Sequence, residues 1–238
     1  MWHRCRTPVV NGTAFASYAG MTPPRMGGDR YRRVLNVMIA MLGLVVALPV
    51  MVLIAILVKL TSRGPVLFTQ QRVGLDRRAP GHEDGNSRRH LNSGGLSFTM
   101  YKFRTMQVNC DAAPAVWALR DDPRVTAVGK VLRKLRLDEL PQLWNVLMGD
   151  MNVVGPRPEQ PAIFAALREQ IEEYPWRQRV LPGITGWAQI NRGYDSSVDD
   201  VREKLNYDLE YMRRRSALED LKIMLLTPAV MLGRRYGW

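Results

Sequence analysis

The longest uncharged and mostly apolar stretch of the chain runs from Val34 to Val58. At about 25 residues it is long enough to cross the hydrocarbon core of a bilayer, which needs about 20. Pro49 lies near its centre, where a proline ring removes a backbone hydrogen bond and kinks a helix. The pattern therefore predicts a membrane helix over residues 30–60 that is broken or bent in the middle.

Basic residues flank this stretch on both sides. A simple spanning helix should carry its Lys/Arg excess at the cytoplasmic end only. An excess at both ends favours a re-entrant helix that bends at Pro49 and returns to the cytoplasmic face, with the freed backbone groups bonded by neighbouring side chains or water. An ordinary tilted spanning helix with a proline kink is the alternative. The flanking residues are Arg25, Arg30, Arg32 and Arg33 before the stretch, and Lys59, Arg63, Arg72, Arg77 and Arg78 after it.

The hydrophobic pattern divides the chain into three regions. Residues 1–29 are rich in Gly, Pro and small side chains, which is typical of a mobile tail. The membrane helix follows over 30–60, and residues 61–238 form a cytosolic, membrane-associated domain. Helical periodicity dominates that domain, so the expected fold class is α-dominated α+β: a Pro-broken membrane helix with amphipathic helices and a small β-hairpin or sheet.

Two stretches alternate between apolar and polar residues as strands do, Val66–Val73 and Leu96–Arg104. The segment from residue 76 to residue 95 between them is rich in Gly, Asn, Ser and charge, so we expect an exposed loop. Lys102 and Arg104 continue an otherwise apolar face of the second strand. Two cations in such positions either extend to solvent or face a site.

Four later segments show helical periodicity or helix-start signals. The first is a basic amphipathic helix, a kind that lies on membrane surfaces or packs on a domain core. The third starts with a capping box and carries a stripe of Val201, Leu205, Leu209 and Met212. The segments are Thr126–Arg136, Gln160–Tyr174, a helix starting at Ser197-Val198-Asp199-Asp200, and a final helix starting at Ser216.

The net charge of +12 and the isoelectric point near 10.2 call for an anionic partner. With a membrane segment present, the anionic cytoplasmic leaflet is the first candidate, because each nearby Lys/Arg contributes about 1 kcal/mol there. Nucleic acid is the rival, but no zinc-finger, RNP or homeodomain pattern appears, so no nucleic acid is expected. Cys5 and Cys110 are the only cysteines, and the three histidines lack zinc-site spacing, which argues against disulfide, redox or zinc chemistry.

The densest chemical signal is the carboxylate pair Asp138-Glu139, which we expect at the start of a helix with Pro141 in its first turn. Two adjacent carboxylates repel each other, so a metal or nearby cations such as Arg133 are expected to hold them. Mg²⁺ binds carboxylates together with substrate phosphates, and an aspartate can also attack phosphorus. The alternative is structural: Asp138 caps a helix and Glu139 complements its dipole.

A second signal is Arg157, held between Pro156 and Pro158 in an extended backbone. Its guanidinium can bind two phosphate oxygens at once. The alternative is that the segment is a rigid connector and Arg157 an ordinary surface arginine. The Gly-punctuated segment 182–189 contains Trp187 and either lines a pocket or turns a corner.

Several longer motifs occur together in a fixed order. The chain thereby resembles the bacterial sugar transferases, the monotopic polyprenyl-phosphate phosphoglycosyl transferases, from about Tyr31 to its C-terminus. The motifs are Gly64-Pro65-Val66-Leu67-Phe68, Tyr101-Lys102-Phe103-Arg104-Thr105-Met106, Leu137-Asp138-Glu139-Leu140, Gly155-Pro156-Arg157-Pro158 and Pro182-Gly183-Ile184-Thr185-Gly186-Trp187-Ala188-Gln189.

The resemblance implies a re-entrant helix broken at a proline and a Mg²⁺-dependent reaction on the cytoplasmic face of the bacterial plasma membrane. Asp138 would attack a UDP-sugar, UMP would leave, and undecaprenyl phosphate would take the sugar phosphate, the first membrane step of polysaccharide or glycoconjugate assembly. Asp138 and Glu139 would be the catalytic and metal-binding residues. The substrate-binding residues implied are Arg157, Arg133, Lys102, Arg104 and Asp220.

Three departures from the family pattern stand out. Leu48 replaces a frequent serine before the proline, Arg192-Gly193 inverts the usual Gly-Arg, and the 76–95 loop is longer than in minimal members. A catalytically inactive membrane scaffold that binds anionic lipid or a partner protein is the second hypothesis, and a membrane-tethered nucleic-acid binder is the third. The sugar, the pathway and the oligomeric state, including a homodimer, stay open.

Overall fold

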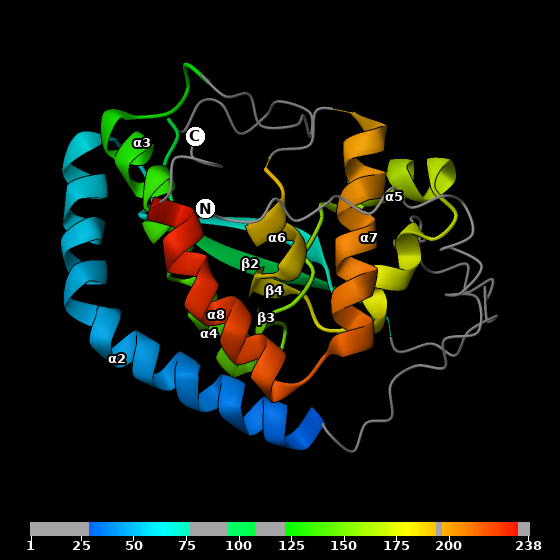
Figure 1. Ribbon diagram of the computed structural model, residues 1–238. Helices are drawn as coiled ribbons and strands as arrows, with labels where there is room; N and C mark the ends of the chain where they lie inside the picture. Colours follow the sequence, from blue (N-terminus) through cyan, green and yellow to red (C-terminus); the bar gives the residue numbers. More distant parts are fainter. Residues whose placement is uncertain (1–28, 77–94, 108–121, 194–196, 233–238) are drawn as a thin grey trace, which may run out of the picture.

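The structure is a computed structural model, and it describes residues 29–76, 95–107, 122–193 and 197–232. Helices dominate, and two two-stranded sheets lie among them (Figure 1). The predicted α-dominated α+β class is therefore confirmed. Of the predicted mobile tail over residues 1–29, all but Asp29 lies outside the described residues, as does most of the predicted loop over 76–95.

The apolar stretch forms helix α2, Asp29–Thr61, which includes Pro49 without interruption. Residues 30–61 are long and apolar enough to cross a membrane, with a mean hydropathy of 3.0 in a window that is only 11% buried. The ribbon of α2 changes direction part-way along, so that its first part runs past α8 and its last part rises beside α3 (Figure 1). A long, bent apolar helix is thus confirmed, and its return to the same membrane face stays a prediction.

The two predicted strands pair as an antiparallel hairpin. Strand β1 is Leu67–Val73 and strand β2 is Ser97–Phe103, with Leu67 opposite Phe103. A second, parallel pair was not expected from the sequence: β3, Asn152–Val154, lies beside β4, Gly183–Thr185. Three residues are too few for alternation to stand out.

The remaining elements are helices, mostly short. The capping box at Ser197 is present and starts α7, as predicted. The predicted helix over Gln160–Tyr174 is too long: α5 ends at Gln170, and a separate 3-10 helix that begins one residue before Pro175 follows. The elements are α3 (Ala127–Lys134), η3 (Leu137–Glu139), α4 (Gln142–Met148), α5 (Pro161–Gln170), η4 (Tyr174–Arg179), α6 (Trp187–Asn191), α7 (Val198–Arg214) and α8 (Ala217–Leu232).

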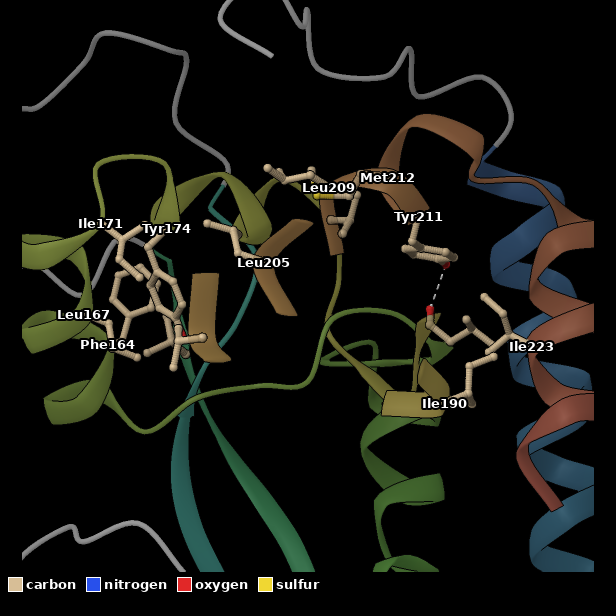
Figure 2. Close-up of a cluster of buried hydrophobic side chains, with 14 residues drawn as sticks. Phe164, Leu167, Ile171, Tyr174, Ile190, Leu205, Leu209, Tyr211, Met212 and Ile223 are labelled. Carbon is tan, nitrogen blue, oxygen red and sulfur yellow. Dashed lines mark hydrogen bonds between the residues drawn. The ribbon is translucent and has the colours of Figure 1, made fainter. Parts of the chain in front are cut away.

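The largest hydrophobic cluster fills the space between α5, η4, α6, α7 and α8 (Figure 2). The predicted α7 stripe of Val201, Leu205, Leu209 and Met212 is buried in it. Two smaller clusters join α2 to the domain. One centres on Ala40, Phe98, Met100, Val146 and Met151, and the other on Ile54, Val58, Phe103 and Leu132.

Polar contacts also dock the first turns of α2. Arg32 forms a buried ion pair with Asp220 of α8 at 2.7 Å and donates to the Tyr211 hydroxyl at 2.7 Å. Arg33 donates to the carbonyl groups at the end of α4. Asn36 accepts a hydrogen bond from the Val153 N–H of β3 at 2.6 Å. Two of the arginines that flank the apolar stretch, Arg32 and Arg33, thus bond groups within the protein.

Candidate active site

Asp138 and Glu139 lie in η3, the turn between α3 and α4, and both are buried. Arg136 precedes them in the left-handed region at φ 54°, which turns the chain sharply after α3. The expectation that a helix starts at Asp138 was wrong in detail. Helix α4 begins at Gln142, and Pro141 is its N-terminal cap residue, because the missing N–H of proline costs nothing there.

Three cations surround the Glu139 carboxylate. Arg157 lies 2.6 Å from Oε1, while Lys102 and Arg136 lie 3.4 Å from the same atom. Burial alone would raise the pKa of Glu139, but Arg157, Lys102 and Arg136 together outweigh it and hold the pKa below its ordinary value. Glu139 is therefore a permanent anion at neutral pH.

The neighbouring Asp138 carboxylate is in a different electrostatic state. Burial raises the pKa of Asp138, and the attraction of Lys102 offsets that effect only in part, while the Glu139 charge adds to it. Burial also lowers the pKa of Lys102 to about 8. The two adjacent carboxylates therefore differ: Glu139 forms ion pairs with three cations, whereas the negative charge of Asp138 is poorly stabilised by its surroundings.

Both carboxylates line a cavity of about 830 Å³. This volume falls in the range of small-ligand sites, roughly 300–1,000 Å³. Basic side chains outnumber acidic ones among its lining residues. These residues come from β1, β2, β4, from the helices α3 to α8, from η3 and η4, and from the Arg157 segment. A cavity with this surplus of positive charge is suited to a ligand that carries several negative charges, such as a diphosphate.

The structure gathers four of the five predicted substrate-binding residues around this cavity, namely Lys102, Arg104, Arg133 and Arg157. Arg133 donates through Nε to the Thr105 hydroxyl at 2.9 Å, which fixes its side chain. The fifth, Asp220, does not line the cavity and is instead the buried partner of Arg32.

Two arginines that the sequence reasoning did not select as site residues bond the backbone of the Arg157 segment, and both also line the cavity. Arg177 donates to the Arg157 carbonyl at 3.1 Å and pairs with the buried Asp208 at 2.8 Å. Arg72 donates to the Pro158 carbonyl at 3.1 Å. The flanking prolines were expected to fix this backbone, and two side chains from distant elements also hold it. No local pattern marks either arginine, because each acts on a segment far along the chain.

The donor set around Asp138 and Glu139 fits a Mg²⁺ ion only in part. Within the residues that the structure describes, no group of three or more His, Cys, Asp or Glu side chains could hold a metal. Mg²⁺ is commonly bound by one or two carboxylates, with water and substrate phosphates completing the octahedron. Asp138 and Glu139 would therefore hold Mg²⁺ together with a phosphate-bearing ligand and not as a preformed protein cage.

Comparison with known proteins agrees with the motifs. The model of the family described as "Bacterial sugar transferase" matches residues 28–234. A UDP-glucose:undecaprenyl-phosphate glucose-1-phosphate transferase of Escherichia coli (strain K12) is 41% identical over 207 residues, covering 86% of this chain and 41% of the relative. A UDP-N-acetylgalactosamine-undecaprenyl-phosphate N-acetylgalactosaminephosphotransferase of Aeromonas hydrophila is 40% identical over 201 residues, covering 84% and 43%.

A shorter relative matches nearly end to end. The exopolysaccharide production protein PSS of Rhizobium leguminosarum bv. phaseoli is 34% identical over 213 residues, which cover 87% of this chain and 98% of the relative. The bent apolar helix and the charged cavity fit a membrane protein with a site for an anionic ligand. The chain belongs to the bacterial sugar transferase family. It spans about two fifths of the length of the Escherichia coli and Aeromonas hydrophila relatives.

Proposed function

We propose that this protein transfers a sugar 1-phosphate from a UDP-sugar to undecaprenyl phosphate, the first membrane step in the assembly of a polysaccharide or glycoconjugate. In the first step an oxygen of the Asp138 carboxylate attacks the β-phosphorus of the UDP-sugar. The bond from that phosphorus to the bridging oxygen breaks, and UMP leaves with the electron pair. The product is an aspartyl-phosphosugar on Asp138.

In the second step a phosphate oxygen of undecaprenyl phosphate attacks the same phosphorus. The acyl-phosphate bond breaks, the Asp138 carboxylate is regenerated, and undecaprenyl diphosphate sugar is released. Arg157 and Lys102 would bind donor phosphate oxygens, with Glu139 orienting both cations. Mg²⁺ held by Asp138 and Glu139 would offset the charge on the diphosphate and the departing UMP.

The observation that carries this proposal is the unequal state of the two carboxylates in one basic cavity. Glu139 is paired with three cations, whereas burial raises the pKa of Asp138. The negative charge of such a poorly stabilised carboxylate is lost when the oxygen bonds to an electrophile. Asp138 is therefore the better nucleophile of the two. The names of the relatives from Escherichia coli and Aeromonas hydrophila, which include UDP-sugars and undecaprenyl phosphate, support the choice of donor and acceptor.

We infer that the domain faces the cytoplasm and that α2 is re-entrant, because UDP-sugars are cytoplasmic and Lys/Arg residues flank both ends of α2. Tags fused at residue 1 and residue 238 would both be reached only from the cytoplasmic side. A tag at residue 1 that a periplasmic or extracellular reagent labels would support a spanning helix instead.

The test of the reaction is UMP release from a panel of UDP-sugars by purified protein with undecaprenyl phosphate and Mg²⁺, with Asp138→Ala measured beside wild type. UMP that depends on the acceptor and on Mg²⁺, from one sugar, and that is absent in the variant would name the reaction and the donor together. No release across the panel would turn attention to a different nucleotide donor or to the scaffold hypothesis.

A further inference from the structure

Arg104 lies where the membrane helix meets the cavity. It follows directly after strand β2, and its backbone N–H donates to the Val66 carbonyl at 2.9 Å. Its side chain donates through Nη2 to the carbonyl and to the hydroxyl of Ser62, both at 2.8 Å. Ser62 is the first residue after α2. The guanidinium is therefore fixed at the end of the membrane helix, and it lines the same cavity as Asp138.

The remaining donors of this guanidinium are buried without a partner. Arg104 is only 6% exposed, and among the described residues neither Nε nor Nη1 has a hydrogen-bond partner. Arginine has five N–H donors and no acceptor, and each buried donor left unpaired costs about 1–3 kcal/mol. The Glu139 carboxylate of the cavity is occupied by other cations. A ligand that supplies anionic oxygens would remove this cost.

Because Arg104 bonds Ser62, directly after α2, it lies next to the apolar second half of that helix. The adjacent Phe103 belongs to the cluster of Ile54, Val58 and Leu132, with Leu137 and Leu140 packed against it. The same half of α2 exposes large apolar side chains on its outer side, at Leu53, Ile56, Leu57 and Leu60. An anionic group that reaches Arg104 along this path would be attached to a hydrocarbon chain. That combination describes a lipid phosphate better than a nucleotide.

We propose that Arg104 binds the phosphate of the polyprenyl phosphate acceptor, with the hydrocarbon chain lying against the second half of α2. This inference rests on the proposed function for the identity of the acceptor. Arg104 is then a ligand for the acceptor, and Arg157 and Lys102 serve the donor. The alternative is a purely structural role for Arg104, as a cap on the Ser62 carbonyl that follows α2.

The direct test is binding, which needs no turnover. Protein in phosphatidylcholine nanodiscs is titrated with undecaprenyl phosphate and, separately, with undecaprenol, which lacks the phosphate. Wild type should bind the phosphate form about ten- to a hundredfold more tightly, the range for charge-assisted hydrogen bonds. Arg104→Gln should lose that preference. Arg192→Gln is the matched control, because Arg192 lines the same cavity but pairs with Asp200 and Glu203, and it should keep the preference.

Two outcomes would overturn the proposal. An undiminished preference in Arg104→Gln would place the phosphate elsewhere. Equal competition by phosphatidylglycerol would mean that Arg104 binds phospholipid headgroups in general and not the acceptor.

Kinetics separate a ligand from a structural cap. Arg104→Gln should raise the KM for undecaprenyl phosphate about tenfold or more, with a much smaller change in the KM for the UDP-sugar, and Arg104→Lys should recover part of the loss. A lower melting temperature with both KM values raised would indicate the cap. In a third outcome, wild type prefers undecaprenyl phosphate to undecaprenol through Arg104 and yet transfers sugar phosphate from no UDP-sugar. That pair of results would support the binding site and contradict the proposed reaction.

Discussion

Two buried groups of charges in this protein differ in how completely they are paired. The first group, which we call the docking site, consists of Arg32 of α2 with Tyr211 and Asp220. Arg32 bonds both oxygens of Asp220 and the Tyr211 hydroxyl, and Tyr211 in turn bonds Asp220. In the cavity, three cations converge on Glu139, and Arg104 keeps two buried donors without a partner among the described residues. The docking site sets one cation against one anion, whereas the cavity has more cations than anions. An excess of positive charge is what separates the candidate binding site from the structural ion pair here.

The largest effects are expected within the cavity, where Asp138 and Glu139 can be neutralised separately. Glu139→Gln removes the anion that offsets three cations, so we expect the free energy of unfolding to fall by about 3–5 kcal/mol at pH 7. Asp138→Asn removes a charge whose pKa is raised by burial, so its ionised form lowers stability at pH 7 and the variant should unfold no more easily than wild type. Thermal unfolding in one detergent measures both.

Activity provides the second readout of this pair. Asp138→Asn should lose turnover by roughly a thousandfold or more, with no covalent phosphosugar adduct detectable by mass spectrometry of the intact protein. An adduct that survives in Asp138→Asn would place the nucleophile elsewhere. Equal destabilisation by the two substitutions would contradict the division of roles between the carboxylates.

Substitutions in the docking site should have the opposite effect to Asp138→Asn: they should lower the stability of the protein more than its catalytic activity. Arg32→Met leaves Asp220 buried without its cation and should lower the free energy of unfolding by about 3 kcal/mol. The double variant Arg32→Met with Asp220→Leu should recover most of that loss, because no uncompensated charge remains. Denaturation of both proteins in the same detergent gives the comparison. A double variant as unstable as the single one would mean that the contacts to Tyr211 dominate.

A smaller effect is expected at Arg177, which lines the cavity and bonds the backbone of the Arg157 segment. Its bond to the Arg157 carbonyl makes it a positioning residue for the donor side. Arg177→Met with Asp208→Leu removes both buried charges, so the backbone bond can be tested with limited damage to the fold. We expect the KM for the UDP-sugar to rise about tenfold with kcat less affected. Unequal changes in donor and acceptor KM, measured at unchanged melting temperature, would distinguish positioning from general loosening.

The sequence predicted those parts of the fold whose signals are local. The capping box of α7, the alternation of β1 and β2 and the long apolar run of α2 each lie within one segment, and each element was found. The β3–β4 pair and the breaks around η3 and after α5 were missed, because these depend on contacts between distant segments. Four site residues carried over from motifs line one cavity, whereas Asp220 belongs to the docking site. Charge type alone cannot distinguish those two environments.

An exposed ion pair serves as the control for both buried groups of charges, and its loss should have the smallest effect. Arg202 pairs with Asp199 at 3.0 Å on α7, and both side chains are largely in water, at 49% and 88% exposed. Solvent screens such a pair, and exposed pairs contribute at most about 1 kcal/mol. Arg202→Gln should therefore leave the melting temperature and both KM values close to wild type, and added salt should change little. If this variant were as damaging as Arg32→Met, burial would not be the property that makes charge pairing consequential in this protein.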